Sequence, residues 1–259
     1  MPTIIPVPAF TDNYIWVMRE GGNAVVVDAG DAAPALAYLD RERLTLTAIL
    51  CTHHHLDHVG GNTALLARFP VPVFGPAGES IPGRTHPLAE GDHIVLPGVG
   101  VELDVLDIPG HTAGHIACAG DIDGPTVFCG DTLFAAGCGR LFEGTPAQMW
   151  RSLSKLAALP AATRIYCGHE YTLANLRFAA AVEPGNKAIA ERAAREQVKR
   201  ERGEPTLPST MAEEWNTNPF LRAEQPAVRS AAEAQAGHPL ADAVATFTVL
   251  REWKNGFRG

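Results

Sequence analysis

Short apolar runs alternate with turn residues along the first two thirds of the chain. Five of these runs are rich in strand-forming residues and end at Gly, Asp or His, which is typical of β-strands. The predicted strands span residues 24–28, 46–52, 101–108, 126–129 and 164–167. Apolar positions with helical spacing separate some of them and predict helices at 34–41 and 59–69.

A third helix is predicted to begin at Thr145. Threonine is a good N-cap, Pro146 suits the first helical position, and Gln148 completes a capping box. Beyond Tyr171 the pattern is helical throughout, with helices predicted at 171–182 and 186–202. A last helix is expected to open at Pro239, and one apolar stripe along it holds Leu240, Val244, Phe247 and Leu250.

These patterns divide the chain near residue 172. Residues 1–171 are predicted to form an α+β or layered α/β/β/α domain, and residues 172–259 a helical domain. With 259 residues, of which 46% are hydrophobic, the chain is long enough for a substantial core. The net charge of −8 argues against a nucleic-acid or anionic-membrane partner, but it allows a small anionic substrate in a local basic pocket.

The first 18 residues carry no basic segment ahead of an apolar one, so neither a secretory signal nor a transit peptide is expected. The five cysteines are an odd number without a Cys-x-x-Cys pair, which favours isolated buried thiols in a reducing compartment. We therefore expect a cytoplasmic protein. No exposed apolar face that would indicate an oligomer is evident, and a monomer is expected.

The segment Thr52-His53-His54-His55-Leu56-Asp57-His58 carries the clearest chemistry. In extended backbone, residues two apart point the same way, so His53, His55 and Asp57 could converge while a turn brings His58 alongside. Neutral imidazole and carboxylate are ligands for zinc and iron-class ions. A solvated polyhistidine loop is the plainer alternative, but four of the chain's ten histidines lie within these few residues.

Three more potential ligands follow predicted strands, each directly after a small residue. They are His111, Asp131 and His169, which come after Gly110, Gly130 and Gly168. A single His or Asp at a strand end is more often a turn or cap residue. Together with the first cluster, these residues could form a two-metal centre at one sheet edge.

These four motifs, in this order, resemble the metallo-β-lactamase superfamily. The resemblance implies a four-layer αββα sandwich with a C-terminal all-α domain. It assigns His53, His55 and His111 to one metal, Asp57, His58 and His169 to the other, and Asp131 to a bridge. By the same resemblance His54 is structural, and His115 is a hydrogen-bonded neighbour of the ligands or a core residue.

Several further stretches resemble the hydroxyacylglutathione hydrolases (the glyoxalase II family), and they extend from the N-terminus into the helical region. The stretches are 11–14, 130–134, 137–140, 143–145, 167–172, 183–186, 208–210 and 218–220. In that family the helical domain contributes to the glutathione site. The resemblance implies that Arg140 and Tyr171 contact glutathione and that Arg251 and Lys254 hold its glycine carboxylate.

The residue pattern gives partial support for the two helical cations. Arg251 and Lys254 continue the apolar stripe of the last helix, where a cation needs an anion or solvent. Complementing the dipole at a helix C-terminus is the alternative. Phe142 stands where some relatives have Tyr, so weaker glutathione binding is expected there, unless Phe142 is simply part of the core.

The resemblance implies hydrolysis of S-(2-hydroxyacyl)glutathione, such as S-D-lactoylglutathione, to glutathione and D-lactate by a metal-bridging hydroxide, a step of methylglyoxal detoxification. Asp57 and Asp131 are the expected catalytic carboxylates, with Asp57 a ligand rather than a free base. Two divalent ions are expected as cofactors, zinc first and iron or manganese as alternatives. A lactonase, a β-lactamase, a one-iron persulfide dioxygenase and a noncatalytic metal- or glutathione-binding protein are the rival interpretations.

Overall fold

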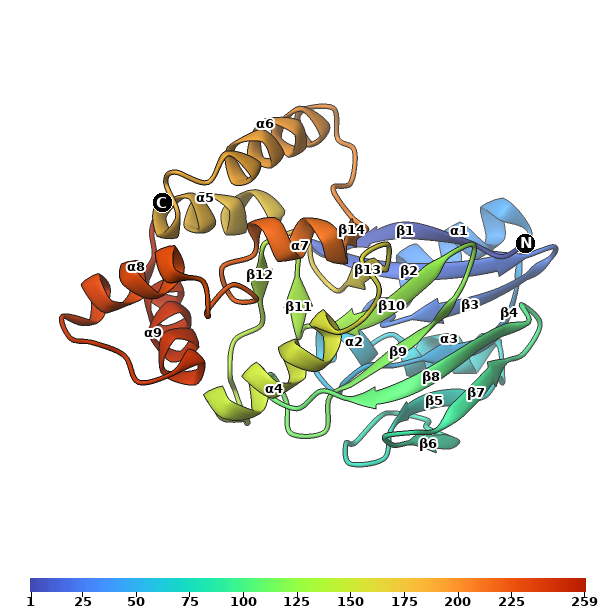
Figure 1. The fold of residues 1–259 in the computed structure, drawn as a ribbon. Helices are drawn as coiled ribbons and strands as arrows, with labels where there is room; N and C mark the ends of the chain where they lie inside the picture. The colour runs from blue at the N-terminus through green and yellow to red at the C-terminus, as the bar shows by residue number, and fades with distance from the viewer.

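Two six-stranded sheets pack face to face in the computed structural model, which describes residues 1–259 (Figure 1). In spatial order the first sheet is β1 (Thr3–Ala9), β2 (Asn13–Glu20), β3 (Asn23–Val27), β4 (Thr45–Leu50), β5 (Val73–Pro76) and β6 (His86–Leu88). The second is β14 (Ser209–Thr210), β13 (Arg164–Cys167), β10 (Pro125–Gly130), β9 (Ile116–Asp121), β8 (Val101–Asp107) and β7 (His93–Leu96). A small hairpin pairs β11 (Leu133–Phe134) with β12 (Gly137–Cys138).

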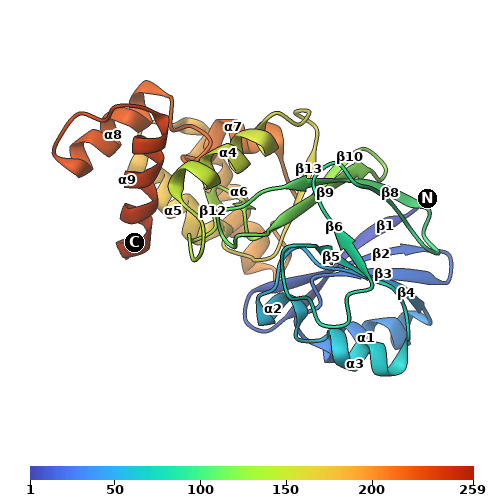
Figure 2. The same cartoon turned by 90° about the horizontal axis from the view of Figure 1, so that it is seen from below.

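The first sheet is buried on both faces, which explains its nearly continuous apolar strands. In β2, Trp16 and Met18 join the large core shared with the second sheet, while Ile15 and Val17 face a smaller core. Alternate residues of a strand point to opposite faces, so one strand serves both cores. The smaller core is closed by α1 (Ala32–Glu42), α2 (Leu56–Val59) and α3 (Asn62–Arg68). Figure 2 shows α1 and α3 below the first sheet.

Parallel pairing brings the strand ends that carry polar residues to the same edge of the sandwich. Strands β3, β4 and β5 pair in parallel in the first sheet, as do β10 and β13 in the second. The carboxyl ends of β4, β10 and β13 are followed by the histidine cluster, Asp131 and His169. The topology therefore gathers side chains that are more than 100 residues apart in sequence.

The chain after β13 is helical apart from β14, the edge strand that it adds to the second sheet. Its helices are α5 (Thr172–Val182), α6 (Lys187–Glu201), α7 (Met211–Thr217), α8 (Pro226–Ala236) and α9 (Ala243–Gly256). Phe178, Phe220 and Phe247 belong to the same large core as the sheets. The division into two domains at 171/172 remains a prediction, although α5 begins there.

The predicted αββα sandwich with a helical C-terminal region is confirmed, as are the five strands and most helix positions. Helix α4 (Pro146–Ala157) begins with the predicted capping box of Thr145 and Gln148. Two predictions of helix extent are wrong. The helix expected at 59–69 is broken at Gly60-Gly61 into α2 and α3, and the last helix begins at Ala243, capped by the Asp242 side chain, rather than at Pro239.

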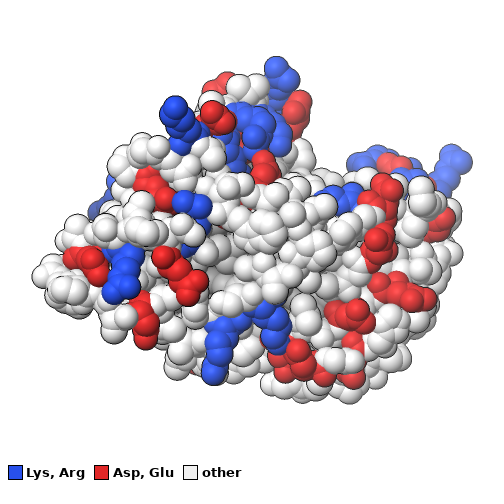
Figure 3. Space-filling view, viewed as in Figure 1, with Lys and Arg blue, Asp and Glu red and all other residues white.

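All five cysteines are free and buried, as predicted. None of the helices has the length and apolar character needed to cross a membrane. In Figure 3, lysines and arginines cluster with some acidic residues around α6 at the top, whereas acidic side chains predominate on the sheet region at the right.

Candidate metal centre

The histidine cluster lies in a tight turn between β4 and α2. His55 has extended backbone angles and is the N-cap residue of α2, and Asp57 and His58 follow in that helix. His53 and His55 therefore belong to one ligand group, as predicted from side chains two residues apart. The same prediction is wrong for Asp57, which lies in α2. Gly30 packs against this turn so closely that a Cβ there would overlap the carbonyl of Asp57, which explains the need for glycine.

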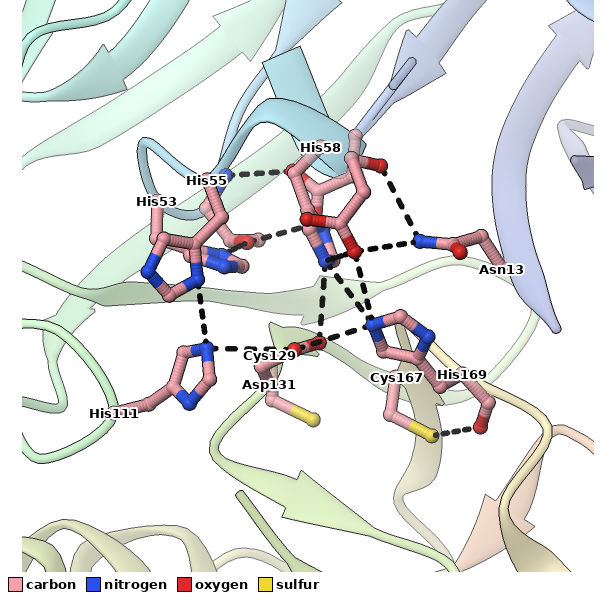
Figure 4. A network of polar contacts seen from close by, with 12 residues as sticks. Asn13, His53, His55, His58, His111, Cys129, Asp131, Cys167 and His169 are labelled. Atoms are coloured by element: carbon pink, nitrogen blue, oxygen red, sulfur yellow. Dashed lines mark hydrogen bonds and ion pairs between the residues drawn. The ribbon is translucent and has the colours of Figure 1, made fainter. Parts of the chain in front are cut away.

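Two groups of three potential ligands form within this edge of the sandwich. The first is His53, His55 and His111, and the second is Asp57, His58 and His169. Within each group the donor atoms lie within 4.8 Å of one another. His55 Nδ1 is 3.0 Å from His111 Nε2, and His58 Nε2 is 3.4 Å from His169 Nε2 (Figure 4).

Asp131 lies between the two groups. Its Oδ2 is 3.4 Å from His111 Nε2 and 3.2 Å from His169 Nε2, while its Oδ1 is 3.3 Å from His58 Nε2. Figure 4 shows this carboxylate at the centre of the network. One carboxylate that reaches histidines of both groups has the geometry of a bridging ligand.

The residues present fit a pair of divalent ions. His53 Nε2 and Asp131 Oδ1 are buried without a hydrogen-bond partner, an arrangement that is costly unless another group binds them. Burial lowers the pKa of His111, and that of His53 well below its ordinary value, so both are neutral imidazoles with a lone pair to donate. Five histidines and two carboxylates are a donor set typical of zinc and iron-class sites.

The second group carries more charge. Burial opposes protonation of His58, but Asp131 and Asp28 outweigh it and hold the pKa of His58 well above its ordinary value. Burial also opposes protonation of His169, but Asp131 and Asp12 outweigh it and raise the pKa of His169 above its ordinary value. Although burial favours its neutral form, Asp131 keeps a pKa well below the usual range because His58 and His169 lie beside it.

Neighbouring groups orient most of the histidines through the ring nitrogen that faces away from the cluster. Asp28 Oδ2 lies 3.1 Å from His58 Nδ1, and Asp12 Oδ1 lies 2.8 Å from His169 Nδ1. His111 Nδ1 donates to the carbonyl of Arg140 at 2.8 Å. Such contacts orient each ring so that its other nitrogen faces the cluster, where a metal would bind the neutral imidazole.

Asp12, Asn13 and Asp28 were not singled out from the sequence. Asn13 Nδ2 donates to Asp57 Oδ2 at 3.1 Å, and Asp28 also accepts from the backbone N–H and hydroxyl of Thr52. Asp28 ends a predicted strand, the same signal that identified the ligands, and could have been found by it. Asp12 precedes β2 and Asn13 begins it. Both lie in the stretch 11–14 that resembles the hydroxyacylglutathione hydrolases, but no role was predicted for either residue.

His115 and His54 are the two histidines expected outside the ligand set. His115 is buried, stacks on His53, and accepts a hydrogen bond from the backbone N–H of Asp131 at 3.1 Å. His54 lies beside the carboxylates of Glu79 and Glu143, and its donor atom is also within 4.8 Å of those of His55 and Glu143, so the role predicted for His54 stays a prediction.

A cavity of about 830 Å³ opens onto the metal-ligand groups. Its lining combines candidate ligands with aromatic residues and three cations: Arg140, which follows β12, and Arg251 and Lys254 of α9. Tyr171 stacks in parallel on His169 with ring centroids 4.7 Å apart. All five residues predicted to bind substrate therefore line one cavity, with Phe142 at 63% exposure, so its alternative placement in the core is wrong.

The cations from α9 have no carboxylate partner. Arg251 is buried, donates to the carbonyl of Cys138 at 2.7 Å, and leaves its buried Nε unpartnered. Lys254 donates to the carbonyl of Ala174 at 2.9 Å, and burial together with the neighbouring Arg251 lowers its pKa to about 8. Cations without a counterion on a cavity wall are suited to an anionic ligand.

Leu56 also lines the cavity and is 78% exposed. It was not predicted as a site residue, because one exposed apolar residue carries no sequence signal.

Comparison with known proteins gives a consistent pattern along the chain. Residues 9–169 match the family model described as metallo-beta-lactamase superfamily, and residues 170–257 match that described as hydroxyacylglutathione hydrolase C-terminus. The chain is 54% identical to a hydroxyacylglutathione hydrolase of Nitrosomonas europaea, covering 100% of this chain and 98% of that one. It is 59% identical to one from Alkalilimnicola ehrlichii, over 98% and 99% of the two chains.

Solved structures share the fold. ETHE1 from Myxococcus xanthus superposes with a TM-score of 0.67 at 23% identity and covers 100% of this chain and 92% of its own. TTHA1623, solved in a di-iron-bound form, has a TM-score of 0.53 at 31% identity and covers 64% of this chain and 91% of its own.

Proposed function

The chain belongs to the hydroxyacylglutathione hydrolase family of the metallo-β-lactamase superfamily, and from this premise we propose that it hydrolyses the thioester bond of S-(2-hydroxyacyl)glutathione. With S-D-lactoylglutathione the products are glutathione and D-lactate. The observation that supports this most directly is one cavity whose wall combines five of the seven potential metal ligands with cations from the family-specific helical region. A lactonase or β-lactamase assignment leaves those cations without a purpose.

The fold and the His/Asp clusters indicate a binuclear metal centre. We assign His53, His55 and His111 to one ion, Asp57, His58 and His169 to the other, and Asp131 to both. Zinc is the proposed native metal, with iron as the alternative, given the di-iron form of TTHA1623. When bound, such ions lower the pKa of water to about 7 and supply hydroxide at neutral pH.

The chain's own residues bind and orient the substrate. Glutathione carries two carboxylates at neutral pH, and Arg251, Lys254 and Arg140 provide cations for them along the cavity wall. Tyr171 packs on His169 and presents its hydroxyl-bearing ring to the same cavity. With its carboxylates held by the cations, the substrate would extend along the cavity wall toward the potential metal ligands that also line it.

The leaving group needs little assistance. A thiol has a pKa of about 8.5, so the thiolate can depart without a strong acid. No free acid or base is therefore required of Asp57, and the hydrogen bond that orients it from Asn13 supports its assignment as a ligand. Residues 172–259 act in this proposal as the part of the chain that supplies Arg251 and Lys254.

The proposal is tested on purified protein whose metal content has been measured. Release of glutathione from S-D-lactoylglutathione is followed in the wild type and in Asp131→Ala. We expect catalysis by the two-metal wild type and its loss in the variant, since Asp131 contacts both groups. Protein that carries two ions per chain and leaves this thioester intact would refute the proposal.

A further inference from the structure

His54 belongs to a polar bridge that connects the two sheets beside the metal centre. Its Nδ1 lies 3.0 Å from Oε2 of Glu79, and its Nε2 lies 3.3 Å from Oε1 of Glu143. Glu79 follows β5 of the first sheet, whereas Glu143 precedes α4 beside the second. His54 thus contacts one carboxylate from each side of the sandwich.

The remaining oxygens of both carboxylates bind a single loop. Glu79 Oε1 accepts from the backbone N–H of Gly114 at 3.0 Å and from the hydroxyl of Thr112. Glu143 Oε2 accepts from the backbone N–H of Ala113 at 2.7 Å. This loop begins with His111, the one histidine of the first group that follows a strand of the second sheet. Asp131, which is assigned to both ions, also follows a strand of that sheet.

The packing around the bridge is close. The Glu79 side chain is only 3% exposed, and a Cβ at Gly114 would lie 2.7 Å from Glu79 Cγ, so a larger residue there would displace the carboxylate. His54 is itself flanked by His53 and His55 in sequence. The bridge therefore joins the turn that carries two ligands of the first group to the loop that carries the third.

We infer that His54 is a positioning residue for the first metal site. It holds the turn at His53 and His55 and the loop at His111 at the separation that the ion requires. The second group, Asp57, His58 and His169, has no contact with Glu79 or Glu143; Asp28 lies beside His58 and Asp12 beside His169. A defect in the bridge should therefore affect one ion and not the other. The inference rests on the proposed ligand assignment.

Fully metal-loaded protein is mixed with an excess of a chromophoric chelator, and the release of each ion is followed in time. The variants are His54→Ala and His54→Asn, whose amide keeps a polar group facing Glu79, which His54 approaches at ion-pair distance. The matched control is His93→Ala, because His93 also lies between two carboxylates, Glu102 and Asp104, but on the exposed β7–β8 edge. Thermal unfolding of the metal-free proteins reports on the fold itself.

In His54→Ala we expect one of the two ions to be released about 10- to 100-fold faster, with the other unchanged. His54→Asn should recover part of the loss, and His93→Ala should match the wild type. Equal acceleration of both ions together with earlier unfolding of the metal-free variant would overturn the inference in favour of a general structural role. Unchanged release of both ions would also overturn it.

These outcomes are distinct from the test of the proposed function. A two-metal protein that is inert toward glutathione thioesters would refute the substrate assignment, while the release experiment would still decide the role of His54. A wild type that holds no ions would overturn the ligand assignment and this inference with it.

Discussion

Replacing Lys254 with methionine should make the protein more stable and a poorer catalyst. The ammonium is half-buried, and its pKa falls from 10.5 to about 8 because of burial and the nearby Arg251. A pKa shift of that size corresponds to a cost of about 3 kcal/mol for keeping the ammonium charged in the folded protein. Because the group is partly exposed to solvent, we reduce this cost to about 1–2 kcal/mol. Methionine keeps much of the packing on Phe178 and Phe257 without this cost.

The free energy of unfolding should depend on pH in a direction that the pKa shift of Lys254 determines. The pKa of Lys254 is lower in the folded state than in the unfolded chain, so between about pH 8 and 10.5 the unfolded chain binds more protons. Wild-type stability therefore contains a cost that is fully present below pH 8 and disappears as the pH rises toward 10.5. Lys254→Met should be more stable by about 1–2 kcal/mol at pH 7, and the difference should shrink by pH 10.

The catalytic effect has the opposite direction. Loss of a charge-assisted contact to a substrate carboxylate, worth about 1.5–3 kcal/mol, should raise KM for S-D-lactoylglutathione roughly 10- to 100-fold while kcat changes little. The assays are urea denaturation of metal-free protein at pH 7 and 10, and steady-state kinetics at pH 7. Lys187→Met, on the exposed side of α6, is the control. A variant less stable at pH 7, or one with unchanged KM, would refute this reasoning.

Three further predictions address the rest of the site. Phe142→Tyr adds a hydroxyl at an exposed position beside His55 and His111, and should lower KM severalfold without altering kcat. An increase in KM would show that the added hydroxyl does not contact the substrate. Asp28→Asn replaces the carboxylate that faces His58 Nδ1 with an amide that can donate, which favours the wrong tautomer of His58. The metal affinity of one site should fall about 10- to 100-fold in a competition titration, and an unchanged metal affinity would contradict the role of Asp28. Chelation of both ions should lower the midpoint of thermal unfolding. For each site, the lost stability is about 4 kcal/mol when the free metal concentration had been 1,000 times its Kd. An unchanged midpoint would exclude a metal centre in the folded state.

The sandwich could be predicted because its signals are local. The strands of the first sheet are apolar on both faces, and Thr145-Pro146-Ala147-Gln148 contains a complete capping box within four residues. The candidate ligands could be proposed from the sequence because most of them closely follow a strand. They meet where strand ends of the two packed sheets come together.

The features that sequence reasoning missed depend on contacts between distant segments. Nothing near Glu79 indicates that its carboxylate reaches His54 and Gly114. His54 and Glu79 follow neighbouring strands of the first sheet, and Gly114 comes near only when the second sheet packs against it. The start of α9 was misplaced since Leu240 fits the apolar stripe but is buried ahead of the helix, where Asp242 provides the cap. The assignment of glutathione came from resemblance, and the structure adds two cations without counterions on the cavity wall.

The most direct test compares two thioesters of the same D-lactoyl group on protein with a known metal content. One is S-D-lactoylglutathione, and the other carries a short neutral thiol that lacks both carboxylates. The account predicts two ions per chain and a kcat/KM at least 100-fold higher for the glutathione thioester, since several carboxylate–cation contacts of about 1.5 kcal/mol or more are lost in the other. Equal kcat/KM for the two thioesters, on protein with two ions bound, would contradict it.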